Sequence, residues 1–170
     1  MKPKAENLFI FSLILSIFLL SQSALSQTRT FTEIQRFQAP EAHQGVAVGA
    51  DLVYPVTNRA IGKYTKESGE HLDTFAWPED SPVIHMDSGV IYDGKLYASH
   101  SNYNDLPMAS SVEIHDAETL EHIGTHSFGI AWGSCTWIDR HDGAWWAVFA
   151  NYSRVFGASP EPYANSYYTT

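Results

Sequence analysis

Short apolar runs separated by polar turns recur along the chain after residue 44. Residues 45–58 read GVAVGADLVYPVTN, and residues 89–102 read GVIYDGKLYASHSN, with their glycines and asparagines in step. Each stretch holds two β-branched or aromatic runs around a turn, and Asp93-Gly94 in the second stretch is a strong signal for a two-residue hairpin. The pattern therefore predicts the same antiparallel strand pair twice.

A second block of the repeat follows each strand pair. IGKYTKESGEHL (61–72) aligns with VEIHDAETLEHI (112–123), and the longer offset comes from an insertion around YNDLPMA. In both blocks a polar turn separates an apolar run from an alternating one, so each unit is predicted to contain four antiparallel strands. A third copy begins at SCTWIDRHDGAWWAVFANY and carries Asp142-Gly143 at its hairpin.

Four antiparallel strands in a repeat of this length are typical of a β-propeller blade. Helices do not explain the pattern, and a β-sandwich, the rival all-β fold, does not require near-identical units at a fixed offset. We therefore expect an all-β chain with about two and a half propeller blades. The expected organisation is a closing outer strand at 27–42, blade one at 43–80, blade two at 81–128 and an incomplete blade three at 129–170.

The beginning of the chain has a different character. Two lysines precede an uncharged apolar run at 8–20, and the small residues of SQSALSQ suit a signal peptidase. We interpret residues 1–26 as a secretory signal peptide, which makes the protein secreted or periplasmic, with the partial propeller at 27–170. An uncleaved membrane anchor is the alternative, although the run is shorter than the roughly 20 apolar residues of a span.

The predicted blades are too few for a closed ring, because known propellers have about four to eight blades. Residues 30–38 resemble a fourth strand without its own blade, and YANSYYTT resembles the start of the third strand of blade three. We therefore expect an N-terminal fragment of a longer propeller, in which the missing blades pair with residues 30–38 and close the ring.

The charge balance narrows the range of partners. The formal net charge is −9, with 10 Lys and Arg against 19 Asp and Glu. Nucleic acid is therefore not expected as a partner, because phosphate binding depends on clustered Lys and Arg. Cys135 is the only cysteine, which excludes an intrachain disulfide, and its apolar setting, GSCTWI, predicts a buried and inert thiol.

One end of the predicted blades collects the functional candidates. The start of each first strand, the loop after the second strand and the connection to the next blade lie there, and we call this end the top face. Long loops on a rigid scaffold are where binding residues normally lie. The residues expected to bind a ligand on the top face are His43, Gln44, Asn58, Asp87, Asn102, Tyr103, Trp132 and Asn151.

Some of the polar residues repeat, which favours structural roles for them. Asn58, Asn102 and Asn151 recur at equivalent positions, where an asparagine caps the turn after the second strand. His71 and His122 repeat in the outer strand and are expected to be surface residues.

Three other histidines do not repeat and are better candidates for chemistry. His85, His100 and His43 could line the mouth of a central channel and act as acid, base or metal ligand. Because these residues lack the spacing of a metal site, neither a metal nor a cofactor is expected.

A family resemblance rests on AHQGVAV, TNRAIGKY and VEIHDAETLEHIGTHSFG. These units resemble blades of secreted bacterial propellers in the superfamily of YVTN-repeat proteins, lactonases and carboxymuconate-cyclase-like proteins, some of which are labelled cycloisomerases. The resemblance implies seven blades. DAETL is similar to the Asp-x-x-Thr-Gly turn of the family, with Leu120 in place of glycine, and no literal YVTN run is present. The fold alone does not define the chemistry.

Two functions remain. The first is an exported binding or scaffold module whose top face holds a small polar molecule, a glycan or a protein. The second is a lactonase- or cycloisomerase-type enzyme for small carboxylates, in which Arg59 holds the carboxylate and His85 or His100 transfers a proton. The sequence favours the first function and does not decide whether the protein is an enzyme.

Overall fold

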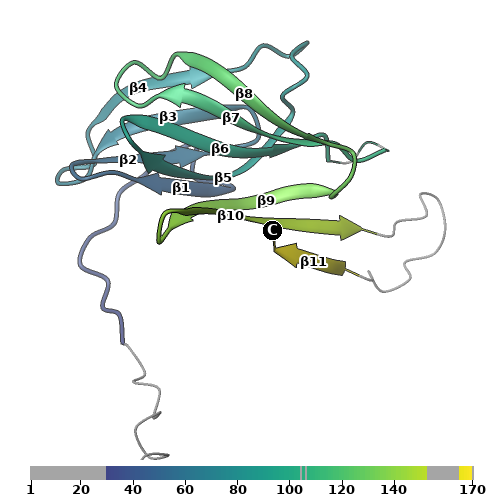
Figure 1. The fold of residues 1–170 in the computed structure, drawn as a ribbon. Coiled ribbons are helices and arrows are strands. Elements are labelled where there is room, and N and C mark those ends of the chain that lie inside the picture. Colours follow the sequence, from purple (N-terminus) through teal and green to yellow (C-terminus); the bar gives the residue numbers. More distant parts are fainter. Residues whose placement is uncertain (1–29, 104, 106, 153–164, 170) are drawn as a thin grey trace, which may run out of the picture. The chain divides into compact units, whose positions relative to one another are not determined.

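The computed structural model describes residues 30–103, 105, 107–152 and 165–169. The chain divides into two units, Met1–Arg36 and Phe37–Thr170. All the elements among the described residues of the second unit are strands (Figure 1), which confirms the all-β prediction. The expected signal peptide at 1–26 lies outside the described residues. Within the described part, no helix has the length and apolar character needed to cross a membrane.

The strands form three antiparallel sheets in chain order, each a meander in which consecutive strands are neighbours. Sheet A contains β1 (Gly45–Val48), β2 (Leu52–Val56), β3 (Ala60–Thr65) and β4 (His71–Ala76). Sheet B contains β5 (His85–Tyr92), β6 (Lys95–Ser101), β7 (Ser110–Asp116) and β8 (His122–Gly129). Sheet C contains β9 (Ser134–His141), β10 (Ala144–Tyr152) and β11 (Asn165–Thr169).

The segment before sheet A differs from the expected outer strand at 27–42. No strand forms among the described residues 30–42, and the chain makes a turn at 40–43. In the second unit, Phe37 stacks on Tyr64 of β3 with ring centroids 6.4 Å apart, so the segment contacts sheet A through side chains. Pairing of residues 30–38 with a missing blade stays a prediction.

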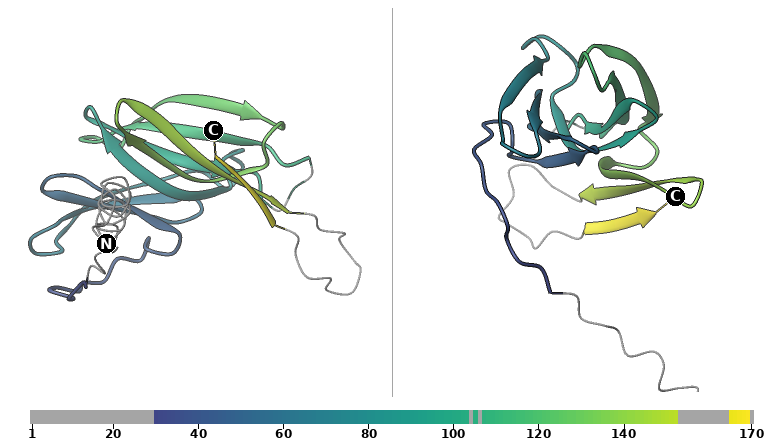
Figure 2. Two further views of the ribbon diagram at one scale, coloured as in Figure 1. Left: turned by 60° about the horizontal axis from the view of Figure 1, so that its bottom comes forward. Right: turned by 90° about the vertical axis from the view of Figure 1, so that its left-hand side faces the viewer.

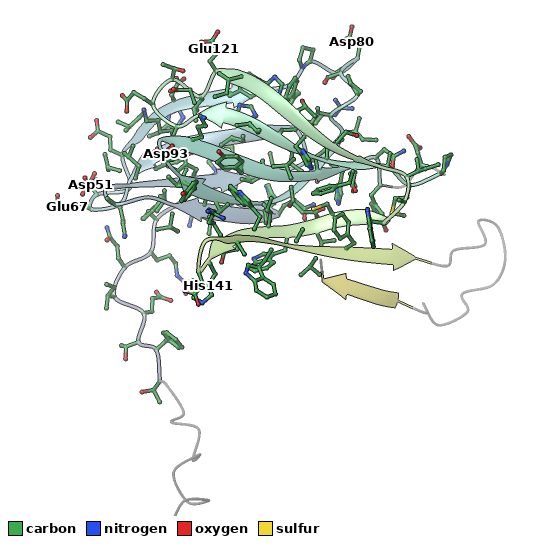
Figure 3. All side chains as sticks on the ribbon, in the orientation of Figure 1. Asp51, Glu67, Asp80, Asp93, Glu121 and His141 are labelled. Carbon is green, nitrogen blue, oxygen red and sulfur yellow. The ribbon has the colours of Figure 1, made fainter. Side chains whose placement is uncertain are left out.

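The predicted two-residue hairpins are present. Asp93 and Gly94 have φ of 49° and 70°, and Asp142 and Gly143 have φ of 49° and 78°. Positive φ at both central residues suits a turn whose twist matches that of antiparallel strands. Figure 3 shows Asp93 with Asp51 and Glu67 at the end of the sheets that carries tight turns.

The turn between the third and fourth strands explains the departure from the Asp-x-x-Thr-Gly pattern. Gly69 has φ 71° in sheet A, and Leu120, its equivalent in sheet B, has φ 59°. A Cβ on Gly69 would lie 2.5 Å from Cγ of Phe37, so a larger residue there would require Phe37 or the turn to move. Leu120 is buried with 1% exposure, and its burial offsets the strain of a left-handed backbone.

The first strands of successive sheets lie against one another, since β1 contacts β5 and β5 contacts β9 (Figure 2). The glycine at the start of the repeat is required by this packing. A Cβ on Gly45 would lie 2.5 Å from the carbonyl oxygen of Asp87, and a Cβ on Gly89 would lie 3.2 Å from Cβ of Ala47.

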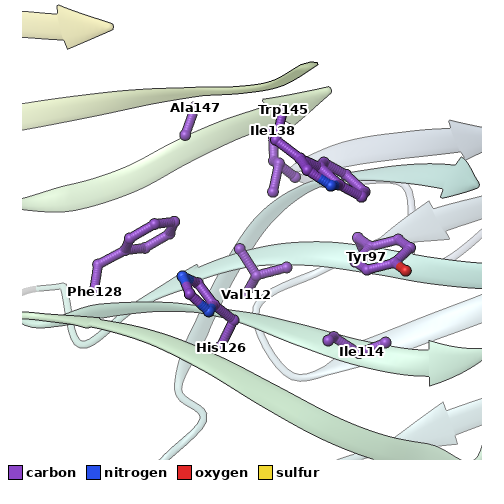
Figure 4. A pocket seen from close by; sticks show the side chains of 8 residues that line it. All are labelled: Tyr97, Val112, Ile114, His126, Phe128, Ile138, Trp145 and Ala147. Atoms are coloured by element: carbon purple, nitrogen blue, oxygen red, sulfur yellow. The ribbon is translucent and has the colours of Figure 1, made fainter. Parts of the chain in front are cut away.

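Two hydrophobic cores fill the spaces between the sheets. Sheets A and B share one that includes Val56, Ile61, Met86 and Leu96, and sheets B and C share one around Phe149. A hollow of about 340 Å³ also lies between sheets B and C (Figure 4). It is lined by Tyr97, Val112, Ile114, His126, Phe128, Ile138, Trp145 and Ala147.

Cys135 lies in the core between sheets B and C. Its exposure is 0%, which confirms that the thiol is buried. Burial raises the pKa of the Cys135 thiol to about 12. Because the thiolate is the reactive form, this environment does not favour a nucleophile.

Candidate functional site

The candidate residues of sheet B gather at one end, as the repeat predicts. His85 at the start of β5 pairs with Ser101 at the end of β6, and Ser101 pairs with Ser110 at the start of β7. Ser110 in turn pairs with Gly129 at the end of β8. We call this end of sheet B the loop end, because it also carries the loop between β6 and β7.

Three of the predicted binding or catalytic residues form a cluster at the loop end. Nε2 of His85 lies 3.2 Å from Oδ1 of Asp87, and each side chain is 16% exposed. The rings of His85 and Tyr103 are 5.1 Å apart between centroids. The second carboxylate oxygen of Asp87 is buried without a hydrogen-bond partner among the described residues. This cluster is an imidazole oriented by a carboxylate, beside an aromatic ring.

His100 is buried next to this cluster, and both of its ring nitrogens are used within the protein. The backbone N–H of Ile84 donates to Nε2 at 3.2 Å, and Nδ1 lies 2.8 Å from Oγ of Ser111. Because Nε2 accepts a hydrogen bond, the proton of the neutral ring lies on Nδ1, which donates to Ser111. Burial lowers the pKa of His100, and the neighbouring Glu113 carboxylate only partly offsets this effect. His100 is therefore a poor proton donor for a substrate.

Arg59 holds the connection between sheets A and B. Its Nη1 donates to the carbonyl oxygens of Pro78 at 3.0 Å, Ser81 at 3.4 Å and Val83 at 3.1 Å. These bonds fasten the segment 78–83 against the sheets. Nη1 of Arg59 is thus engaged with the backbone rather than presented to a carboxylate ligand.

Several other predicted residues have local structural roles. Asn102 donates from Nδ2 to the carbonyl of Pro107 at 3.1 Å and accepts from the N–H of Ala109 at 2.6 Å, so it closes the loop after β6. Gln44 donates to Oδ1 of Asn58 at 2.7 Å in an exposed pair. The contacts of Asn102 agree with the expected turn-capping role, whereas Asn58 is bonded to the side chain of Gln44.

The remaining predicted residues are not drawn into the cluster by any contact seen in the described part. His43 is exposed in the turn before β1. Trp132 is 43% exposed, and its ring lies 6.1 Å from that of Phe149. Asn151 lies in β10, and its side chain is outside the described part.

A polar cavity of about 550 Å³ opens beside His100 and Asn102. One wall is the connection between sheets A and B, and the other is the face of sheet B that looks toward sheet A. The cavity is lined by Trp77, Pro82, Val83, His100, Asn102, Ala109, Ser110, Ser111, Glu113, His122, Thr125 and Ser127. Its volume falls within the range of about 300–1,000 Å³ that is typical of small-molecule sites.

The cavity wall contains a hydrogen-bonded network around a buried carboxylate. Glu113 is 2% exposed. Its Oε1 accepts a bond of 2.6 Å from Ser111, and its Oε2 accepts bonds of 2.6 Å from Thr125 and 2.9 Å from Nε2 of His122. Through Ser111 the network also reaches His100. A buried carboxylate is tolerated when donors satisfy it in this way.

Sequence reasoning missed Glu113, Ser111, Thr125 and Ser127. The available signal was the alternation of β7, in which Ser111, Glu113 and His115 alternate with the apolar Val112 and Ile114. Such alternation identifies a polar face, but it does not show that the polar face is covered. The prediction that His122 is a surface residue was wrong, because this ring is half-buried against Glu113.

Part of the network recurs in sheet A with a different chain segment. Thr74 donates to Oε1 of Glu41 at 2.9 Å, and Nε2 of His71 lies 2.8 Å from the same Thr74 hydroxyl. A Cβ on Gly62, the equivalent of Glu113, would lie 2.8 Å from Oε2 of Glu41. The carboxylate of Glu41 thus lies beside the position that Glu113 occupies in sheet B. His71 is exposed, as predicted.

The fold and the site define an all-β protein of repeated antiparallel meanders with a polar cavity at the loop end of the second sheet. No family model matches the chain, and a search of curated proteins finds no match. The resemblance to YVTN-repeat and lactonase-like propellers therefore stays a prediction.

Proposed function

We propose that the protein is an exported β-propeller module that binds a small polar molecule in the cavity at the loop end of sheet B. The propeller is supported by the repeated meander sheets, whose first strands contact one another in succession. In a propeller the first strand of each blade lies nearest the central axis. Export rests on the signal-like character of residues 1–26.

The proposal rests on one observation: the polar groups expected to perform catalysis form hydrogen bonds within the protein itself. Both ring nitrogens of His100 bond to the protein, and Nη1 of Arg59 bonds to three backbone carbonyls. A general acid or base must reach the proton that it transfers, and Nη1 of Arg59 is not available to clamp a carboxylate. The cavity, in contrast, combines apolar and polar side chains in the manner of a binding site.

The enzyme alternative now depends on His85. Its contact with Asp87 resembles the orientation of a catalytic imidazole by a carboxylate. A lactonase- or cycloisomerase-type reaction at this place would use His85 as acid or base, and substitution of His85 by alanine would abolish it.

A ligand screen tests the proposed function. The protein is mixed with a library of small acids, sugars, alcohols and amines, and binding is detected by ligand-observed NMR. We expect binding to the wild type and to Ala50→Leu, and loss of binding in Ala109→Leu. Ala109 lines the polar cavity, whereas Ala50 is exposed in the turn between β1 and β2.

Two results would contradict the proposed function. One is a folded protein that binds no member of the library. The other is turnover of lactones or muconate-type diacids that disappears in His85→Ala, because this result would establish the enzyme alternative.

A further inference from the structure

We infer that the ligand of the polar cavity is a small organic cation, such as a primary amine or a quaternary ammonium compound. This inference rests on the proposed binding function and adds the chemical class of the ligand. Four features support it: the charge of the lining, the hydrogen-bond acceptors beside Glu113, the aromatic wall and the charge of the whole chain.

The charge of the lining favours a cation. Glu113 is the only acidic residue that lines the cavity, and no lysine or arginine is among the described lining residues. In the described part, the ion-pair contacts of Glu113 are to His122 at 2.9 Å and His100 at 3.9 Å. Since the Nε2 atom of His100 accepts a hydrogen bond, His100 supplies no fixed positive charge. Both partners are histidines, and no lysine or arginine in the described part forms an ion pair with Glu113, so a bound ammonium group would supply a permanent cation.

The wall offers hydrogen-bond acceptors beside the carboxylate, together with two groups that have no partner among the described residues, Nε1 of Trp77 and the hydroxyl of Ser110. The hydroxyls of Ser111 and Thr125 both donate to Glu113, so their protons are already used. Each hydroxyl oxygen still has lone pairs, because a hydroxyl accepts as well as donates. A ligand with N–H or O–H groups can donate to these oxygens, whereas an anion placed beside Glu113 would meet a like charge.

An aromatic wall faces the same cavity. The ring centroids of Trp77 and His122 are 4.7 Å apart, and both residues line the cavity with Pro82 and Val83. Indole is the side chain that attracts organic cations best, and the apolar residues accommodate alkyl groups. A neutral polyol would gain the hydrogen bonds but not the attraction to the carboxylate and the indole.

The charge of the whole chain acts in the same direction. The formal net charge is −9. A negative protein raises the local concentration of small cations at low ionic strength. This effect assists any cation equally, so selectivity must come from the cavity itself.

Two pairs of probes that differ mainly in charge test the inference on the full chain. Choline is compared with its neutral isostere 3,3-dimethyl-1-butanol, and ethanolamine is compared with ethylene glycol, by titration calorimetry or NMR. We expect at least one cation to bind, with its neutral partner weaker by about tenfold or more, because the neutral partner lacks the charge that the Glu113 carboxylate and the Trp77 indole attract. This comparison requires no substitution, so it does not depend on the folding of a variant.

A substitution then locates the charge that is recognised. Glu113→Gln keeps the shape of the side chain and removes its charge, and it is expected to reduce cation affinity by about tenfold. Glu121→Gln is the matched control, because Glu121 is exposed at the start of the outer strand and does not line the cavity.

The outcomes separate the two proposals. Equal binding of a cation and its neutral isostere, or preference for the neutral member, would overturn the cationic class while leaving the binding module in place. Binding of sugars or acids in the library screen, without binding of either cation, would do the same. If the folded protein bound no member of the library, the proposed function itself would be contradicted.

Discussion

Thr125 donates a hydrogen bond of 2.6 Å to the buried carboxylate of Glu113, from one strand of sheet B to its neighbour. The equivalent bond in sheet A, from Thr74 to Glu41, joins the sheet to the segment that precedes it and is exposed to solvent. The same repeated threonine thus serves a carboxylate from two different places in the chain. The repeat keeps the threonine donor, whereas the accepting carboxylate comes from β7 in sheet B and from the segment before β1 in sheet A.

The two threonines should differ in their contribution to stability. Thr125→Val removes a donor from a buried carboxylate and is expected to lower the free energy of unfolding by about 1–3 kcal/mol. Thr74→Val is expected to cost about 0.5 kcal/mol or less, because water can replace an exposed hydroxyl. Urea denaturation of both variants measures the difference. Equal costs would show that the burial of Glu113 does not determine the strength of the bond.

Arg59 is expected to act on stability through the segment 78–83. Arg59→Leu removes a charged donor shared by three carbonyls and should lower the free energy of unfolding by about 1.5–3 kcal/mol. Arg59→Lys should recover part of this loss, since it keeps the charge without the planar fork. Lys66→Leu is the control, because the side chain of Lys66 is exposed and its Nζ makes a weak contact of 3.5 Å with the carbonyl of Ala50. Unchanged stability of Arg59→Leu would contradict the structural role.

Two buried histidines should make the fold sensitive to acid. Burial lowers the pKa of both His100 and His115 in the folded protein. In the unfolded chain an ordinary histidine binds a proton near pH 6.5, which the folded chain does not yet bind. By linkage, stability is complete above about pH 6.5 and decreases as the pH falls toward the lower folded pKa values.

His115 offers the cleaner test of this pH dependence. Its Nδ1 donates to the carbonyl of Leu120 at 2.9 Å, and its Nε2 is buried without a partner in the described part. His115→Phe keeps a ring and should reduce the loss of stability between about pH 7.5 and pH 5.5. His141→Phe, at an exposed position, should leave the loss unchanged. A wild-type urea midpoint that does not change across this range would contradict the prediction.

Leu120 is expected to stabilise the folded protein even though its backbone is in the left-handed region. Leu120→Gly relieves roughly 1–2 kcal/mol of backbone strain but removes a buried side chain worth about 2–3 kcal/mol, with an added cost for the cavity. We expect a net loss of about 1–2 kcal/mol in thermal or urea unfolding. Gly69→Ala, the reciprocal change in sheet A, should also destabilise, because its Cβ would lie 2.5 Å from Phe37. A more stable Leu120→Gly variant would overturn this explanation.

Much of the architecture could be predicted because its causes are local. Asp93-Gly94 and Asp142-Gly143 specify hairpins through their own backbone preferences, and the structure has positive φ at all four residues. Alternation and turn composition likewise placed four strands in each of the first two units. The apolar setting of Cys135 correctly indicated burial, because neighbours in a strand share the same core.

The candidate site was predicted only in part. The repeat predicted that His85, Asp87 and Tyr103 lie at the same end of sheet B, and the structure has them in contact. It did not reveal that His100 and Arg59 bond to the protein itself, because their partners come from the connection between sheets. Those bonds depend on the path of the connection between sheets A and B. This connection is not part of the repeat, so the repeat does not predict its path.

The sequence by itself determined the repeated unit, its turns and the glycines that recur with it, since these follow from backbone sterics and from alternation within a strand. Only the tertiary structure decided that the polar face of β7 borders a cavity, and that Glu41 lies beside Gly62 where sheet B has Glu113. Alternation assigns a side chain to one face of a sheet, but what covers that face is set by the packing of distant segments.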